Sequence, residues 1–291
     1  MKEIVIISGK GGTGKTTITA ALASLVKNNV IADCDVDAAD LHLILNPDIR
    51  QQEDFFSGKT AFIRQGDCTQ CGKCVEVCHF DAISPDFVVD PVSCEGCGVC
   101  VAFCPAYAID FNQNLCGQWF ISKTRFGSLV HAKLGIAEEN SGKLVSLVRK
   151  QAKQMAKKEN AEYIIVDGAP GVGCPVISSI TGASAVIVVT EPTLSGLHDM
   201  KRVVSLAGDF FQLSTFLCVN KADLNPDITE KMMEFCDTNG VHFAGRVPYD
   251  ESTTRAMVEG KNIFEFKPGP AAAAIREIWA EVEDTLRGNK N

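Results

Sequence analysis

Eight regularly spaced cysteines form the densest chemical signal in this sequence. They occur in two runs with the same intervals, the second beginning 26 residues after the first: Cys68, Cys71, Cys74 and Cys78, then Cys94, Cys97, Cys100 and Cys104. This spacing is typical of [4Fe–4S] ligands, where one run supplies three thiolates and the other run the fourth. We therefore predict two [4Fe–4S] clusters, one on Cys68, Cys71, Cys74 and Cys104 and one on Cys94, Cys97, Cys100 and Cys78.

Zinc is the alternative for closely spaced cysteines, but a zinc site needs only four ligands, arranged in pairs. The first run departs from the usual cluster pattern, because His79 rather than proline follows its last cysteine. The ring of His79 either donates to a cluster sulfur or lies in solvent, and we favour solvent. A donor near the sulfurs would raise the potential of that cluster.

A glycine-rich segment near the start of the chain predicts a phosphate site. It has the pattern G-x-x-x-x-G-K-T between an apolar run and a helical pattern, and its residues are Gly9, Lys10, Gly11, Gly12, Thr13, Gly14, Lys15, Thr16 and Thr17. Glycines allow successive backbone N–H groups to point at phosphate oxygens, and the following helix adds positive potential. In such a site Lys15 neutralises phosphate charge and Thr16 binds Mg²⁺. The alternative is a plain glycine-rich turn.

Short apolar segments must position these groups. We predict strands near residues 3–8, 30–32, 163–166, 185–190, 215–219 and 241–245, separated by helical patterns. Apolar strands that alternate with amphipathic helices are typical of a parallel sheet covered on both faces. Two of the strands end in carboxylates, which suit a hard cation beside phosphates: Asp33, Asp35, Asp37 and Asp40 follow one, and Asp167 follows the other.

The glycine-rich segment resembles the deviant Walker A motif of the MinD/ParA/Mrp superfamily of P-loop ATPases, whose second lysine is matched by Lys10. The resemblance implies that Lys10 contacts phosphate across the dimer interface of a nucleotide sandwich. Residues 31–37 resemble switch I, which implies that Asp35 orients the attacking water and Asp33 lies near the metal. Residues 163–171 resemble Walker B and switch II, so Asp167 would hold Mg²⁺ through water. We interpret Asp37 and Asp40 as loop or helix-capping residues.

Residues 219–223, Val-Asn-Lys-Ala-Asp, resemble the base-recognition segment of P-loop proteins. The resemblance implies that Asn220 meets the adenine base and that Pro248 packs beside it. An N-K-x-D pattern also suits GTP, so the prediction of ATP depends on Lys10.

The cysteine-rich segment interrupts the α/β pattern and predicts two domains. We expect an α/β P-loop NTPase, with a mostly parallel sheet flanked by helices, at residues 1–60 and 112–291. Residues 61–111 would form an inserted bacterial-type α+β ferredoxin domain. About fifty residues bury too little surface to be stable unaided, so the folding of this segment should depend on its clusters.

Composition excludes several classes of protein. Apolar residues make up 46% of the 291-residue chain and charged residues 22%, which favours a globular fold over disorder. The formal charge of −8 opposes binding to nucleic acid. No apolar run reaches the roughly 18 to 20 residues that span a bilayer. The helical pattern at residues 271–286 has no basic face, so we expect it to pack on the core rather than on a membrane.

The cysteine content indicates a reducing compartment and hence a cytoplasmic location, because eight of the 13 cysteines have metal-ligand spacing. The other five are Cys34, Cys116, Cys174, Cys218 and Cys236. We expect most of them to be buried as small hydrophobes. Cys174, in the switch II region, is either a buried thiol at a helix start or a ligand for a bridging cluster, and we favour the buried thiol.

The two chemistries together predict an iron–sulfur protein that binds and hydrolyses ATP. The whole chain resembles MinD-superfamily ATPases with an inserted ferredoxin domain, relatives of Mrp-type iron–sulfur carriers. One hypothesis couples nucleotide state to the assembly or carriage of an iron–sulfur or related metallocofactor, and the other is ATP-gated electron transfer. The expected partners are a second copy in an ATP-dependent homodimer and a protein redox partner or cluster acceptor. Spatial organisers that bind membrane or DNA are a third class, against which the charge and the C-terminal helix argue.

Overall fold

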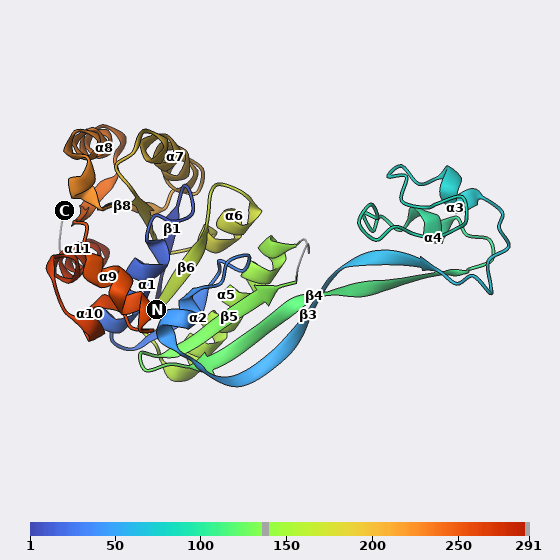
Figure 1. Ribbon diagram of the computed structural model, residues 1–291, viewed down its shortest axis with the longest axis horizontal. Coiled ribbons are helices and arrows are strands. Elements are labelled where there is room, and N and C mark those ends of the chain that lie inside the picture. Colours follow the sequence, from blue (N-terminus) through green and yellow to red (C-terminus); the bar gives the residue numbers. More distant parts are fainter. Residues whose placement is uncertain (136–139, 289–291) are drawn as a thin grey trace. The chain divides into compact units, whose positions relative to one another are not determined.

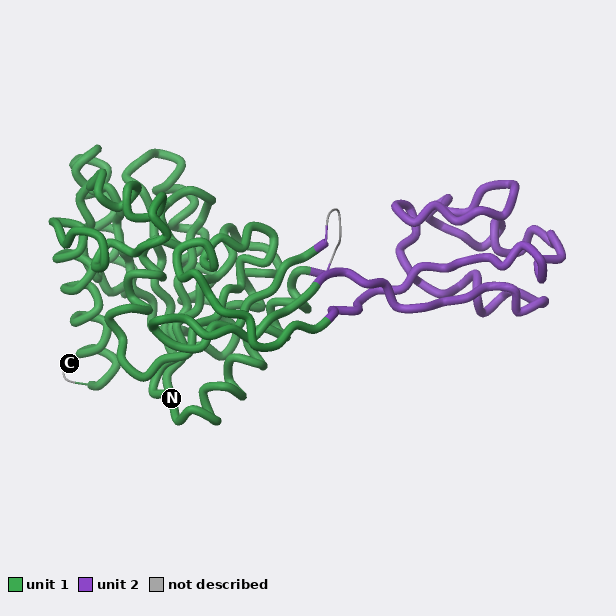
Figure 2. The backbone as a smooth tube through the Cα atoms, turned by 60° about the horizontal axis from the view of Figure 1, so that its bottom comes forward, with its two compact units in different colours: residues 1–53, 118–134, 141–291 green, residues 54–117, 135–140 purple. Residues whose placement is uncertain are grey.

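The computed structural model describes residues 1–135 and 140–288 and divides into two compact units (Figure 2). Unit 1 comprises residues 1–53, 118–134 and 141–291, and unit 2 comprises residues 54–117 and 135–140. Unit 2 is therefore wider than the expected insertion at 61–111.

A mostly parallel sheet forms the centre of unit 1 (Figure 1). The strand order is β3-β4-β5-β2-β6-β1-β7-β8-β9. The strands with predicted counterparts are β1 (Lys2–Ser8), β2 (Asn29–Asp33), β6 (Tyr163–Pro170), β7 (Ala185–Thr190), β8 (Ser214–Asn220) and β9 (His242–Val247). β1 pairs in parallel with β6 and β7, and the pairs β2–β5, β2–β6, β7–β8 and β8–β9 are also parallel. This confirms the predicted fold class of unit 1.

Helices cover both faces of this sheet. They are α1 (Lys15–Leu25), α2 (Leu41–Leu45), α5 (Ser141–Glu159), α6 (Cys174–Ile180), α7 (Leu194–Ser205), α8 (Pro226–Asn239), α9 (Glu251–Val258), α10 (Ile263–Phe266) and α11 (Pro270–Arg287), with a π-helical turn, Leu206–Phe210, after α7 and a 3₁₀ turn, Ala222–Leu224, after β8. In β1, Ile4 and Ile6 belong to one core cluster with residues of α1 and α11. Val5 and Ile7 alternate with them and are also fully buried. Side chains alternate across a strand, so the opposite face is covered as well.

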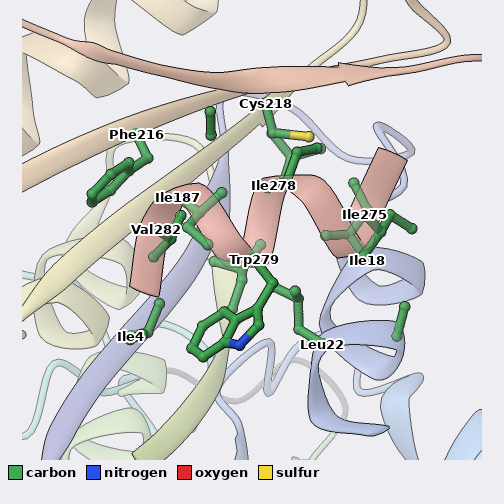
Figure 3. Packing of buried hydrophobic residues seen from close by; sticks show 14 of the residues in the cluster. Ile4, Ile18, Leu22, Ile187, Phe216, Cys218, Ile275, Ile278, Trp279 and Val282 are labelled. Carbon is green, nitrogen blue, oxygen red and sulfur yellow. The ribbon is translucent and has the colours of Figure 1, made fainter. Parts of the chain in front are cut away.

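The C-terminal helix α11 packs on the core, as predicted. Figure 3 shows Ile275, Ile278 and Val282 of this helix among residues of the sheet and of α1. The Trp279 ring meets the Tyr163 ring edge to face, with centroids 5.4 Å apart. Among the described residues, no helix combines the length and apolar character needed to cross a membrane.

Two long strands that the sequence analysis did not predict run from unit 1 into unit 2. They are β3 (Asp48–Ile63) and β4 (Ile109–Lys123), and β4 is followed by β5 (Ser128–Leu134). The four residues between β4 and β5 are too few for a parallel crossover, so these two strands form a hairpin.

Unit 2 repeats its backbone conformation with the 26-residue period of its sequence. Its two short helices, α3 (Lys73–Glu76) and α4 (Val99–Ala102), each follow a glycine with positive φ, 77° at Gly72 and 74° at Gly98. Two residues earlier, φ is 56° at Gln70 and 60° at Gly96. The small core contains Ala61, Ile63, Ile83 and Ile109 together with cysteines from both runs.

A buried histidine in unit 1 gives the fold a pH dependence. The His131 ring stacks on Phe120 at 4.8 Å, lies parallel to the His42 ring at 6.2 Å, and has its Nε2 3.0 Å from the Ser122 hydroxyl. Burial, with a smaller contribution from His42, lowers the pKa of His131 to about 4. Because this pKa lies below the ordinary value of 6.5, the unfolded state binds more protons between these two pH values.

We therefore expect stability to be complete above pH 6.5 and to fall towards pH 4. A His131→Phe variant keeps an aromatic ring in the stack and should lose this part of the decline. The measurement is the midpoint of unfolding in urea at several pH values. Unfolding is monitored by the fluorescence of Trp119 and Trp279, which are the two tryptophans and both lie in unit 1. The control is His198→Gln. The His198 side chain is 72% exposed, so its replacement should leave the pH dependence of stability unchanged. Equal slopes for wild type and His131→Phe would contradict the prediction.

Candidate nucleotide site and cysteine pockets

The glycine-rich loop lies between β1, which ends at Ser8, and α1, which begins at Lys15. Gly14 has a φ of 87°, and a Cβ there would lie 2.3 Å from the Asn220 side-chain nitrogen. A Cβ on Gly9 would lie 2.5 Å from the Asp199 Cβ. Glycine is therefore required at both ends of the loop, at Gly14 by the left-handed backbone and the approach of Asn220, and at Gly9 by the close approach of α7.

Lys15 brings together the carboxylates of Asp167, within β6, and Asp35, just after β2. Its Nζ lies 2.9 Å from Asp167 Oδ1 and 3.3 Å from Asp35 Oδ2. The hydroxyls of Thr16 and Thr19 donate to the Asp167 carboxylate at 2.7 and 2.9 Å. Burial alone would lower the pKa of Lys15, but the carboxylates of Asp167 and Asp35 outweigh it and raise that pKa. The ammonium thus neutralises two buried carboxylates.

The acidic segment after β2 divides into buried and exposed members. Asp33 is fully buried, and its oxygens accept hydrogen bonds from the backbone N–H groups of Asp35 and Leu41. Burial, reinforced by Asp167, raises the pKa of Asp33 well above its ordinary value. Burial also raises the pKa of Asp35, against the effect of Lys15. Asp37 is exposed, and the Asp40 side chain makes no capping bond to α2.

A cleft joins these groups to the ends of β8 and β9. Its lining includes Gly11, Gly12, Gly14, Lys15, Thr16, Thr17, Asp35, Asn220, Pro248, Tyr249, Thr253 and Met257. The side chain of Asn220 donates to the carbonyl of Thr13 at 2.8 Å and accepts from the backbone of Lys221. The structure therefore gathers the predicted phosphate, water-orienting and base residues around one cleft.

Sequence reasoning did not predict two contacts that hold the segments around this cleft. The Asp223 carboxylate accepts the backbone N–H of Tyr249 at 2.7 Å and so ties the segment after β9 to the N-K-x-D segment. Lys221 forms an ion pair of 2.6 Å with Glu191. The N-K-x-D pattern includes Asp223, but nothing in the local sequence indicates that its partner is the backbone of a residue 26 positions later.

The side chain of Lys10, in the glycine-rich loop, reaches the start of α7. Its Nζ is 3.4 Å from Thr193 Oγ1 and 3.3 Å from Ser195 Oγ, both within its own chain. Within the described part of the chain, the ammonium of Lys10 is thus held by hydroxyls and pairs with no carboxylate.

Two small, mainly apolar pockets in unit 2 are lined by the eight regularly spaced cysteines. One pocket is lined by Cys78, Cys94, Cys97 and Cys100 and the other by Cys68, Cys71, Cys74 and Cys104. Each pocket thus combines three cysteines of one run with the last cysteine of the other. Backbone N–H groups of Gln70 and Ala108 lie 3.4 Å from the sulfurs of Cys68 and Cys104.

No group of three or more His, Cys, Asp or Glu side chains among residues 1–135 and 140–288 is placed to hold a single metal ion. A cubane places a different requirement on its ligands, because each thiolate binds a different iron and the four sulfurs surround a volume instead of a point. Four thiols around an apolar pocket fit that requirement, and the pocket that contains Cys68 and Cys104 also has N–H donors to sulfur.

The remaining cysteines follow the prediction with one exception. Cys34, Cys116, Cys218 and Cys236 are buried. Cys174 is exposed, so the expectation of a buried thiol there was wrong. It is the first residue of α6, whose buried face begins only at Val176. His79 is exposed, in agreement with the solvent interpretation.

Comparison with known proteins places this architecture among nucleotide-binding proteins. The family described as the CobQ/CobB/MinD/ParA nucleotide binding domain matches residues 4–263. An uncharacterized protein of Methanocaldococcus jannaschii is 37% identical over 226 residues, 77% of this chain and 79% of that protein. An iron-sulfur cluster carrier protein of Pyrococcus horikoshii is 24% identical over 307 residues, 98% of this chain and 86% of that protein.

Solved structures show the same fold. The septum site-determining protein MinD of Pyrococcus horikoshii, complexed with Mg-ADP, matches with a TM-score of 0.60 at 20% sequence identity. The match covers 100% of this chain and 98% of that one.

Proposed function

This chain belongs to the CobQ/CobB/MinD/ParA nucleotide-binding domain family and is an ATPase of the MinD/ParA type, and from that premise we propose that it couples its nucleotide state to the handling of two [4Fe–4S] clusters. In this proposal unit 2 is an inserted ferredoxin domain. Its clusters serve the assembly or carriage of an iron–sulfur or related metallocofactor. Cluster thiolates require a reducing compartment, so we propose a cytoplasmic location.

The single observation that carries the proposal is the grouping of the cysteines around the two pockets. Four thiols line each pocket, and in each case both runs contribute. Scattered structural cysteines would not be expected to converge in two such sets. Cys68, Cys71, Cys74 and Cys104 would hold one cluster, and Cys94, Cys97, Cys100 and Cys78 the other. Bound clusters would supply one-electron redox chemistry or transferable iron and sulfide.

The nucleotide site supports a division of roles among its residues. The loop from Gly9 to Thr17 would surround the phosphates, with Asn220 and Pro248 beside the base. Lys15 now neutralises Asp35 and Asp167. If Lys15 turned to phosphate, these carboxylates would lose its positive charge and would be free to hold Mg²⁺.

Within that arrangement, Thr16 and Asp167 would hold the cation, with Asp33 nearby. Asp33 already accepts two backbone hydrogen bonds, so its role would be to shape the segment that presents Asp35. Asp35 would orient the attacking water. Lys10 would complete the catalytic set from the partner in an ATP-dependent homodimer.

ATP-gated electron transfer to a partner is the second candidate. Cysteines of both runs belong to the small core of unit 2, so losing a cluster would disturb that core. This favours retention of the clusters. The carriage hypothesis is supported instead by the similarity to a relative named as an iron-sulfur cluster carrier protein. Accordingly, the protein partner is either a cluster acceptor or a redox protein.

The proposal is tested by anaerobic purification with iron and sulfide analysis and EPR, with and without Mg-ATP. Two clusters correspond to about eight irons per chain, and coupling predicts an EPR signal that changes with nucleotide. Absence of iron and sulfide would overturn it. Incubation with a purified apo-ferredoxin then separates the candidates. A carrier should transfer its clusters, whereas an electron donor should keep both through repeated turnover with an artificial acceptor.

The cross-ligation of the clusters makes a prediction for paired cysteine variants. Cys104→Ala should remove one cluster, leaving about four irons per chain. Adding Cys71→Ala should cause no further loss, because both residues would serve the same cluster. Adding Cys97→Ala instead should remove the second cluster as well. Iron content after identical anaerobic reconstitution is the measurement. If the Cys104/Cys97 pair kept half of the iron while the Cys104/Cys71 pair lost all of it, each run would hold its own cluster.

A further inference from the structure

A groove lined by cationic side chains lies between α5 and α6 in unit 1. Its cationic lining is Arg149, Lys150, Lys153 and Lys157, and none of the described residues that line it is acidic. Such a concentration is unexpected in a chain with a formal charge of −8.

The floor of the groove is a buried ion-pair network. The Arg149 guanidinium donates to both oxygens of Glu3 at 2.7 Å and to the carbonyls of Ser178 and Thr181 at 2.7 and 2.9 Å. Lys153 Nζ lies 2.9 Å from the same Glu3 carboxylate. Two cations therefore share one anion, and the network keeps a net positive charge. Arg149 also fixes the end of α6 against α5.

Two further lysines on the groove carry a positive charge that no described carboxylate neutralises. Lys150 and Lys157 are exposed, and neither forms an ion pair with a described residue. Lys143, also exposed, precedes Lys150 by seven residues. Seven residues are close to two helical turns, so the three lysines share one side of α5 over about 21 Å.

We propose that this groove docks an acidic segment of a partner protein and that nucleotide state controls the docking. Charge complementarity requires an anionic occupant. A long nucleic acid would be repelled by the rest of a chain with charge −8, whereas a short acidic segment places its charge on the groove alone. Ile177 adds an apolar contact to the lining with 36% of its surface exposed, which suits a peptide side chain better than a phosphate backbone.

The control by nucleotide follows from the position of α6. This helix forms one wall of the groove and begins seven residues after Asp167, which contacts Lys15. The segment between them contains Gly171, whose φ is 92° and whose N–H donates to the carbonyl of Ser8 at the end of β1. Rearrangement around Asp167 can therefore displace the groove wall. By linkage, a partner that binds one nucleotide state more tightly must raise the affinity of the protein for that nucleotide by the same factor. This inference requires the ATPase and is independent of the clusters.

The test uses the full chain and a fluorescent 15-residue polyglutamate peptide at low ionic strength. Lys150→Glu with Lys157→Glu should weaken peptide binding by about tenfold or more, because two attractive charges become repulsive. The matched control is Lys27→Glu with Lys231→Glu, which makes the same charge change at exposed residues outside the groove. The control should weaken binding far less. The affinity for the peptide should also differ between the Mg-ADP form of the protein and an Asp35→Ala variant that holds Mg-ATP.

Three outcomes would overturn the inference. An equal loss in both double variants would mean that only overall charge matters. Tighter binding of a 20-base-pair DNA duplex than of the peptide, lost in the groove variant, would make this a nucleic-acid site. Equal peptide affinity in the two nucleotide states would remove the coupling. The rate of ATP hydrolysis without peptide should be unchanged in both double variants, which shows that they are folded.

Discussion

Replacement of Lys15 by alanine is expected to abolish nucleotide binding while both clusters stay in place. Lys15 is the buried cation at the start of α1 and the group that would meet the phosphates. The cysteine pockets consist of unit 2 residues only, so the change should not reach them. We expect affinity for Mg-ATP to fall by about a hundredfold or more, since a buried charge-assisted contact is lost. Titration calorimetry measures the affinity, and iron analysis the clusters.

The same variant should show a second effect without nucleotide. Removing Lys15 leaves Asp35 and Asp167 buried without their cation, which costs stability while they remain ionised. Lys15 lowers the pKa of Asp35 against the effect of burial, so without Lys15 that pKa would rise further, and part of the loss should be recovered as pH falls and Asp35 becomes neutral. Lys27→Ala, which removes an exposed lysine just after α1, is the control. Retained affinity for ATP in Lys15→Ala would refute the assigned phosphate site.

The convergence of the candidate nucleotide-site residues was predictable because they lie at the carboxyl ends of parallel strands. β1, β2 and β6 are continuous apolar segments, and each leads directly into a motif residue. The sheet order places β6 between β2 and β1, so Asp35, Lys15 and Asp167 had to converge. Residues at such ends meet wherever parallel strands are neighbours.

The strands β3 and β4 were not predictable in the same way. Residues 48–53 of β3 are all exposed and mostly polar, so they have no alternating apolar pattern. Their strand conformation depends on pairing with β4, whose residues lie far along the chain. Pairing between distant segments leaves no pattern that can be recognised within a short window of sequence. The exposure of Cys174 has a related cause, because the buried face of α6 depends on how the whole helix packs against α5.

The second large effect concerns Lys10. Its ammonium lies 3.4 and 3.3 Å from the hydroxyls of Thr193 and Ser195, which are its only hydrogen-bond partners among residues 1–135 and 140–288. Such hydrogen bonds contribute little at an accessible site, so the side chain can leave α7 at low cost. Lys15 already supplies the cation within one chain, which leaves Lys10 free to neutralise phosphate bound by a second copy. We therefore predict that Mg-ATP promotes a two-fold dimer.

Lys10→Ala should keep nucleotide binding by the monomer but lose ATP-dependent dimerisation and hydrolysis together. Asp35→Ala is the background for the test, because loss of the water-orienting carboxylate should slow hydrolysis more than binding and so retain ATP. Sedimentation with Mg-ATP should show a dimer for Asp35→Ala and a monomer for the double variant that also lacks Lys10. Asp35→Ala with Lys27→Ala should remain dimeric, which separates the role of Lys10 from a general loss of charge. If Asp35→Ala is itself monomeric with ATP bound, the sandwich is wrong for this protein, and any coupling between nucleotide and clusters must operate within one chain.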